Sequence, residues 1–261
     1  MTEEVIRRGQ GDDAPRGAQS VTRAVRVLET FTVARPALTL VEIAGASALA
    51  PPTAHRLLRA LQSHELVVFD ELRRQYSLGP GVMRLSDAIT ARNDVIRLAP
   101  AKLQQLRDDS GETVALHWRV DHVRVCLLEV LSIRPLHVAS GVGNAYPLVA
   151  GASGKAILAH LSTLDAEQIM GAHPALTTTR RSKLERELGT VRKRGYALSA
   201  AETVPGASAI AAPIFGRDGH AVAAINLTGP IDRLTTARLT ELSPGVLACA
   251  AELSASGEPS T

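Results

Sequence analysis

A stretch near residue 55 combines the residue types that contact duplex DNA. At helical spacing, one face is apolar and consists of Ala54, Leu57, Leu58 and Leu61. The opposite face is polar and consists of Pro52, His55, Arg56, Arg59 and Ser63. The short polar groups and guanidinium forks that suit base edges and phosphates are those of Thr53, His55, Arg56 and Arg59. Because no acid occurs between residues 51 and 64, a phosphate backbone would meet no like charge there.

Three helices are expected to position this face. Apolar residues recur at helical spacing over 20–31, and Ser20 is placed as the N-cap of that helix. Thr39 is expected to cap a second helix over 40–46. Prolines at positions 51 and 52 then open the third helix, because proline is tolerated in a first turn.

A hairpin is expected directly after the third helix. Two β-prone runs, 67–69 and 76–78, flank a charged turn that contains Arg73 and Arg74. This turn would form a wing whose arginines hold phosphates together with Thr39. Two alternatives stay open: a three-helix packing module with an ordinary solvated face, or a metabolite-binding sensor whose N-terminal helices only dimerise.

The rest of the chain predicts an α+β fold class, because strands and helices occur in blocks. Strands are expected over 113–119, 123–131, 136–140, 196–199, 209–215 and 221–228. Helices are expected over 95–109, 154–161, 164–170, 182–194 and from about 235. Ser182 and Glu185 have the spacing of a capping box, and Gly195 stands where a helix-ending glycine belongs.

Composition limits the classes of protein to consider. The 261 residues are 45% hydrophobic and 21% charged, which excludes wholesale disorder. Aromatic residues, at 3%, are too few for a single-stranded nucleic-acid platform, while a net charge of +3 permits a polyanionic partner. Cys126 and Cys249 are the only cysteines, which indicates buried thiols in a reducing cytoplasm. No signal peptide or membrane span is recognised, so a cytoplasmic location and no membrane partner are expected.

Local signatures of enzyme chemistry are missing from the sequence. Without a His-Glu-x-x-His, paired Cys-x-x-Cys or Gly-x-Ser-x-Gly motif, we expect no catalytic residue, no metal site and no cofactor. Residues 151–155 end in Gly-Lys, but Ala156 stands where a P-loop needs Ser or Thr for magnesium. Two interpretations of this turn stay open: a helix N-terminus that favours a small carboxylate, or small residues that let a helix approach a sheet.

Whole segments also follow one another in a specific order and spacing. In the N-terminal half they are SVTRAVRVLETF, PTAHRLLRALQSHELV and YSLGPGVMRLS. In the C-terminal half they are SGETVALH, GASGKAILA, RGYALSAAE, PGASAIAAPIF and AAINLTGP. Over nearly the whole chain, this order resembles the IclR-type transcriptional regulators. The resemblance implies a non-enzymatic DNA-binding regulator, dimeric or a dimer of dimers, with a winged helix-turn-helix domain and a GAF-like effector-binding domain.

The resemblance also implies domain limits and a mode of action. The expected segments are a tail (1–18), the winged helix-turn-helix domain (19–80), a linker helix (81–97), the effector-binding domain (98–256) and a tail (257–261). We expect a repressor of an inverted-repeat operator whose DNA-binding heads are re-spaced by the effector, with an activator as the alternative. Ala48 and Pro51 depart from the family pattern of a glycine and a basic residue. We expect Ala48 to avoid the left-handed backbone, so that operator affinity rather than the fold is affected.

If the turn over 151–155 is a helix N-terminus that favours a carboxylate, then Gly151, Ala152 and Ser153 form the lip of an effector pocket. By the same resemblance, three small residues complete this pocket: Ser199, Ala207 and Ala209. Their size favours an organic acid larger than a two- or three-carbon acid, for example an aromatic acid. His117 and Trp118 are neighbours on a strand and therefore point to opposite faces, so at most one faces the pocket, and Trp118 is expected in the core.

Overall fold

The computed structural model describes residues 18–256 apart from residues 33, 91, 92 and 175. The chain divides into two compact units, 1–91 and 92–261. The tails expected at 1–18 and 257–261 lie, except for Ala18, outside the described residues. Within the described ranges, no helix combines the length and the apolar character needed to cross a bilayer.

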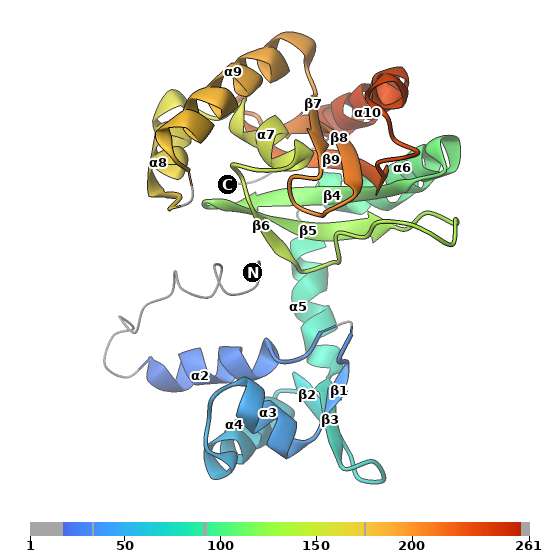
Figure 1. Cartoon of the computed structure of the whole chain (residues 1–261). Helices are drawn as coiled ribbons and strands as arrows, with labels where there is room; N and C mark the ends of the chain where they lie inside the picture. Colours follow the sequence, from blue (N-terminus) through green and yellow to red (C-terminus); the bar gives the residue numbers. More distant parts are fainter. Residues whose placement is uncertain (1–17, 33, 91–92, 175, 257–261) are drawn as a thin grey trace. The chain divides into compact units, whose positions relative to one another are not determined.

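The N-terminal unit is a helix-turn-helix with a small antiparallel sheet (Figure 1). Its helices are α2 (Gln19–Leu28), α3 (Leu40–Ala46), α4 (Pro51–Ser63) and α5 (Pro80–Thr90). Its strands, paired in the order β1-β3-β2, are β1 (Ala37–Leu38), β2 (Val67–Asp70) and β3 (Gln75–Leu78). The core between them includes Val27, Ile43, Leu58, Val67 and Tyr76. The predicted winged helix-turn-helix arrangement is confirmed.

Hydrogen bonds at the helix starts confirm one predicted cap and overturn another. The Thr39 hydroxyl accepts the Glu42 N–H at 3.4 Å, and Glu42 Oε2 accepts the Thr39 N–H at 2.8 Å, which forms a capping box on α3. The prediction that Ser20 caps α2 is wrong. The Thr22 N–H donates to the Ala18 carbonyl at 3.0 Å, so Ala18 is the N-cap and Ser20 lies inside the first helical turn.

The C-terminal unit is a six-stranded antiparallel sheet with helices on both faces, which confirms the predicted α+β class. Its helices are α6 (Asp94–Ser110), α7 (Ala152–Leu158), α8 (Thr163–Ala172), α9 (Thr178–Arg194) and α10 (Thr236–Ser256). Its strands are β4 (Thr113–Val120), β5 (Val123–Val130), β6 (Ala145–Pro147), β7 (Ala197–Ala200), β8 (Ala207–Phe215) and β9 (Ala221–Pro230). They pair in the order β6-β5-β4-β9-β8-β7.

Alternation along the strands separates two layers of core. On β8, Ile210 and Ile214 pack in the layer of α6 and α10, whereas Ala209 and Ala211 pack in the layer of α7, α8 and α9 (Figure 1). On β8, the face toward α6 and α10 therefore carries two isoleucines, while the face toward α7 carries alanines. The small residues leave space on the α7 side of the sheet.

The predicted strand over 136–140 is wrong. The Glu129 carboxylate accepts the N–H groups of Ser140 at 2.5 Å and Gly141 at 3.1 Å, so these donors are not free for a strand ladder. The edge strand is instead the short β6, which pairs with β5.

The ends of α9 give one wrong and one confirmed prediction. The Thr177 hydroxyl accepts the Arg180 N–H at 3.4 Å, so α9 begins at Thr178. Ser182 therefore lies inside the helix, and the predicted capping box is wrong. Gly195 ends α9 with a φ of +81°, as its position predicts.

The turn between α3 and α4 contains a strained residue. Ala48 has a φ of +54°, which is left-handed backbone, so the expectation that alanine avoids this region is wrong. The Leu49 N–H donates to the Ala44 carbonyl at 3.0 Å and holds the turn in this form. A Cβ in left-handed backbone costs about 1–2 kcal/mol.

We expect Ala48→Gly to raise the free energy of unfolding of the helix-turn-helix by about 0.5–1 kcal/mol, because removing the Cβ strain outweighs the added freedom of the unfolded chain. Native-state hydrogen exchange of the α3 and α4 amides in the full chain measures this change. Ala60→Gly, at an exposed position inside α4, is the matched control and is expected to be destabilising. Equal destabilisation by both substitutions would show that the turn is unstrained.

Candidate nucleic-acid interface and ligand cavity

α4 presents one face to the core and the other to solvent. The buried face consists of Ala54, Leu57, Leu58 and Leu61, as the spacing predicts. Pro52, His55, Arg56 and Arg59 are exposed, and Thr53 is half-buried. Within the described part of the chain, the side chains of His55, Arg56 and Arg59 form no hydrogen bond or ion pair. Glu65, the next acid, pairs with Arg84 at 2.7 Å, so the cations of α4 stay available to an external anion.

The hairpin that follows α4 carries two further exposed arginines. Arg73 Nη1 lies 3.6 Å from Asp70 Oδ2, and the Arg74 guanidinium lies 5.7 Å from the centroid of the Phe69 ring. Leu72, at the tip, is 97% exposed. The two contacts hold the turn while both guanidinium groups remain at the surface.

Thr39 is engaged in its own helix cap. Its hydroxyl donates to Glu42 Oε2 at 2.7 Å, and Arg35 Nη2 lies 3.9 Å from Glu42 Oε1. The backbone hydrogen bond from Thr39 lowers the pKa of the Glu42 carboxyl, so the group is ionised at neutral pH. A phosphate near Thr39 would meet this negative charge, which makes Thr39 the least favourably placed of the predicted DNA contacts.

The predicted effector residues surround a cavity on the α7 side of the sheet, which we call the inner cavity. Its free volume is about 30 Å³, room for about two water molecules. Five of the six predicted residues line it: Ala152, Ser153, Ser199, Ala207 and Ala209. Polar side chains that the sequence prediction had not placed there also line it: His117, Arg124, Tyr146, Glu202, Asn226 and Thr228.

Gly151, the sixth predicted residue, is not among the residues that line the inner cavity. Its N–H donates to Glu202 Oε2 at 2.9 Å, so a carboxylate of the chain itself occupies this donor. A Cβ on Gly154 would lie 2.6 Å from both Arg124 Nη1 and the Leu148 carbonyl oxygen. The small residues of this turn are therefore needed for close packing of α7, which supports the second interpretation of the motif.

A buried arginine on β5 lines the inner cavity. Arg124 is 3% exposed, and its Nη1 donates to the carbonyl groups of Pro147 and, at 2.8 Å, Ala150. Its guanidinium lies 5.3 Å from the centroid of the Tyr146 ring. Burial lowers the pKa of Arg124 to about 10, so the group stays charged at neutral pH. Among the described residues, no carboxylate pairs with it and Nε has no partner, so an anion would be favoured beside it.

His117 and Trp118 point to opposite faces of β4, as predicted. Trp118 packs against the layer of α6 and α10, and His117 lines the inner cavity. Both ring nitrogens of His117 are buried without a hydrogen-bond partner among the described residues. Burial, together with the charge of Arg124, lowers the pKa of His117 to about 3, so the ring is neutral at pH 7. A neutral imidazole offers a ligand one donor and one acceptor.

The residues that the prediction missed leave a modest trace in the sequence. Arg124 interrupts the apolar strand VRVCLLEV, and Asn226 and Thr228 interrupt the apolar run AAINLTGP. Polar residues at buried strand positions are unusual unless they have partners or a function. The register places Asn226 and Thr228 on the face of His117, but that pairing is visible only in the structure.

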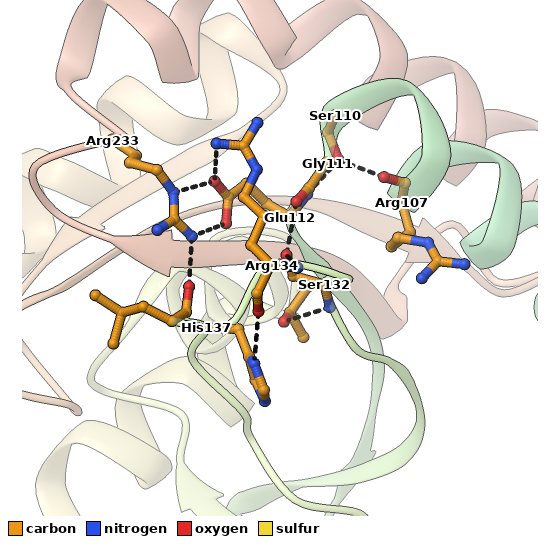
Figure 2. A network of polar contacts seen from close by, with 10 residues as sticks. Arg107, Ser110, Gly111, Glu112, Ser132, Arg134, His137 and Arg233 are labelled. Carbon is orange, nitrogen blue, oxygen red and sulfur yellow. Dashed lines mark hydrogen bonds and ion pairs between the residues drawn. The ribbon is translucent and has the colours of Figure 1, made fainter.

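A polar network holds the segment that follows β5 (Figure 2). Glu112, 2% exposed, accepts the Arg233 Nε and Nη2 donors at 2.7 and 2.9 Å. Arg233 Nη2 also donates to the Leu136 carbonyl at 2.8 Å, and the Ser132 hydroxyl donates to the Gly111 carbonyl at 2.7 Å. These bonds anchor a segment whose cavity-lining residues are Val138, Ala139 and Ser140.

Acid sensitivity is the expected consequence of the buried His117. The unfolded chain binds a proton near the ordinary histidine pKa of 6.5, whereas the folded chain binds it only near pH 3. The contribution of His117 to the free energy of unfolding is therefore fully present well above pH 6.5, and it is lost as the pH falls from 6.5 toward 3. Between pH 7 and pH 5, the loss is expected to be about 2 kcal/mol.

His117→Leu is expected to remove this part of the pH dependence, because leucine binds no proton in either state. Urea unfolding at pH 7 and pH 5, followed by the fluorescence of the single tryptophan, Trp118, measures the difference. The same pH dependence in the variant as in the unaltered chain would contradict the assignment.

Comparison with known proteins gives matches for both units. Residues 20–71 match the IclR helix-turn-helix domain, and residues 87–255 match the C-terminal domain of the bacterial transcriptional regulator IclR. The chain is 32% identical over 251 residues to the HTH-type transcriptional regulator BhcR of Paracoccus denitrificans, covering 94% of this chain and 90% of that protein. It is 29% identical over 242 residues to the transcriptional repressor IclR of Escherichia coli, covering 90% of this chain and 88% of that protein.

The fold agrees with these matches. A crystal structure of an IclR transcriptional regulator from Alicyclobacillus acidocaldarius superposes with a TM-score of 0.78 at 27% identity, covering 90% of this chain and 97% of that one. The exposed basic face of α4 thus occurs in a chain whose two units both match one family of regulators. The chain belongs to the IclR family of DNA-binding transcriptional regulators.

Proposed function

We propose that this regulator acts in the cytoplasm as a repressor that binds an inverted-repeat operator as a dimer or a dimer of dimers. A small organic acid in the inner cavity would change its operator affinity. The observation that carries the DNA-binding mode is the exposed, acid-free face of α4, whose arginines have no partner within the described chain. The repressor name of the Escherichia coli relative favours repression over activation.

The DNA contacts would divide between base edges and phosphates. The residues proposed for the major groove are Pro52, Thr53, His55, Arg56 and Arg59. Those proposed for phosphates are Thr39, Arg73 and Arg74, with Thr39 the weakest because of Glu42. Arginine forks suit this division, since they bind either guanine edges or phosphate oxygens through two hydrogen bonds.

The effector class follows from the charge and size of the inner cavity. Arg124 provides a buried positive charge without a paired carboxylate among the described residues, which favours an anion. Asn226, Thr228 and the neutral His117 add hydrogen-bonding groups for a keto or hydroxyl oxygen. The free volume of about 30 Å³ favours a small acid. The larger, aromatic acid that the small lining residues favour would need this lining to move apart.

Regulation then rests on a difference in effector affinity between free and operator-bound protein. Two half-sites demand a set separation of the DNA-binding heads, so a modest change in their spacing alters operator affinity. If the effector bound both forms equally well, occupancy of the inner cavity would leave operator affinity unchanged.

We expect Arg56→Ala with Arg59→Ala to weaken operator binding about 30-fold or more and to reduce its salt dependence, because charge-assisted contacts are lost. Fluorescence anisotropy of a labelled duplex from upstream of the gene, titrated with the full chain at two salt concentrations against random duplex, measures both effects. A genome-wide pool of fragments serves if that duplex lacks the operator.

Arg186→Ala with Lys193→Ala is the charge-matched control, because both residues are exposed on α9 in the other unit. Its operator affinity is expected to stay within about twofold of the unaltered chain. Equal weakening by the two double variants would mean that net charge, not the α4 face, determines binding. Absence of selective binding to any fragment would favour the metabolite sensor.

We expect Ala207→Leu to abolish the effector response while operator binding remains, because its added carbons fill a cavity of only about 30 Å³. Thermal unfolding of the full chain with two- and three-carbon acids, a dicarboxylate and benzoate identifies acids that raise the midpoint. Stabilisation by the same acid in the variant would place the effector elsewhere.

A further inference from the structure

A second cavity lies beside the inner cavity in the C-terminal unit, and we call it the outer cavity. Its free volume is about 710 Å³, against about 30 Å³ for the inner cavity. α9, β7 and the start of α10 contribute to it (Figure 1). Ser199, Glu202 and Ser208 line both cavities and form the wall between them. The outer cavity is thus a separate space of the size that small-molecule sites have.

Much of the lining of the outer cavity is apolar. Its larger apolar side chains are Leu176, Leu184, Val191, Leu198 and Leu239. Leu184, Val191 and Leu239 are buried parts of the core, so they form a firm wall. A ligand with an apolar body would gain roughly 25 cal/mol for each Å² of apolar surface that it buries there.

The charged groups of the outer cavity carry an excess of positive charge. The cations are Lys155, Arg180, Lys183 and Arg194, and the carboxylates are Glu187 and Glu202. Lys155, whose side chain is 5% exposed, pairs with both carboxylates, at 3.0 Å from Glu187 and 2.5 Å from Glu202. Lys183 Nζ also lies 3.8 Å from Glu187 Oε1. Because four cations share two carboxylates, the lining keeps a net positive charge whatever the pairing, and this charge favours an anion.

His173 adds a buried ring nitrogen, Nδ1, without a hydrogen-bond partner among the described residues. Burial lowers the pKa of His173, which favours the neutral ring. A neutral imidazole can accept a hydrogen bond from a ligand hydroxyl or donate one to an anionic group.

We propose that the outer cavity binds an organic anion with an apolar body, of the size of an aryl sulfonate or a medium-chain fatty acid. The body lies against the leucines, and the anionic group lies at the rim near Arg180 and Lys183. This site differs from the inner cavity in volume and in its cations, and it does not depend on how the chain binds DNA.

The probe for this site is 8-anilinonaphthalene-1-sulfonate, whose fluorescence rises in apolar surroundings. We expect saturable binding to the full chain at one site. Arg180→Glu with Lys183→Glu reverses the rim charge and is expected to raise the Kd about tenfold or more. Arg186→Glu with Lys193→Glu makes the same charge change on exposed residues of α9 outside the cavity lining, and its Kd is expected to stay within about twofold.

A second variant changes no charge. Thr190→Trp places a large ring at an exposed position in the lining and is expected to block the probe. Octanoate is expected to displace the probe at lower concentration than acetate. Three results would overturn the proposal: equal weakening by both charge reversals, unchanged binding in Thr190→Trp, or loss of probe binding in Ala207→Leu, which alters only the inner cavity.

Discussion

The buried guanidinium of Arg124 is the constraint on which the ligand-binding side of the C-terminal unit depends. A fully desolvated cation is costly unless polar groups surround it, and here the carbonyl groups of Pro147 and Ala150 and the ring of Tyr146 do so. The same group leaves no room for a side chain at Gly151, just before α7, or at Gly154, in its first turn. A Cβ at either position would come within 2.7 Å of a guanidinium nitrogen. The glycines of the GASGK motif are therefore explained by an arginine 27 to 30 residues earlier in the chain, together with the Leu148 carbonyl beside Gly154 and the positive φ of Gly151, and not by a phosphate.

The cavity beside Arg124 exists because the sheet divides its side chains unevenly. Alternation sends Ile210 and Ile214 of β8 toward α6 and α10, and sends Ala207 and Ala209 toward α7. Antiparallel register then sets Ala209 beside both Ser199 and Thr228, which gathers small and polar side chains from three strands. Large aliphatic residues of α7 and α9, such as Ile157, Leu158 and Leu188, pack elsewhere on the same side of the sheet, so the small strand residues can leave space there at little loss of packing.

Features set by local periodicity were predictable from the sequence, whereas features set by distant contacts were not. The two faces of α4, the capping box at Thr39 and the end of α9 at Gly195 each depend on a few neighbouring residues. The failures at Ser20, Ser182 and 136–140 have another cause, because other residues set these boundaries. Ala18 and Thr177 begin their helices earlier than predicted, and the distant Glu129 accepts the Ser140 N–H. Ala48 shows that a turn held by its two helices can impose a backbone that alanine disfavours. Arg124 escaped prediction because its role depends on carbonyl groups that only the fold brings near.

The charges around the two cavities determine which kind of anion each cavity is expected to bind more tightly. Lys155 is buried but already pairs with Glu187 and Glu202, so a ligand near it would compete with two carboxylates of the chain. Arg124 has no such pair among the described residues, and His117 beside it is neutral, so Arg124 is the one cation of the inner-cavity lining, and Glu202 on the same lining offsets part of its charge. One charge favours a monoanion, because a second negative charge in the same space would itself be buried without a partner. At the outer cavity the rim cations are more exposed, so their attraction is screened by salt and apolar contact must supply most of the affinity.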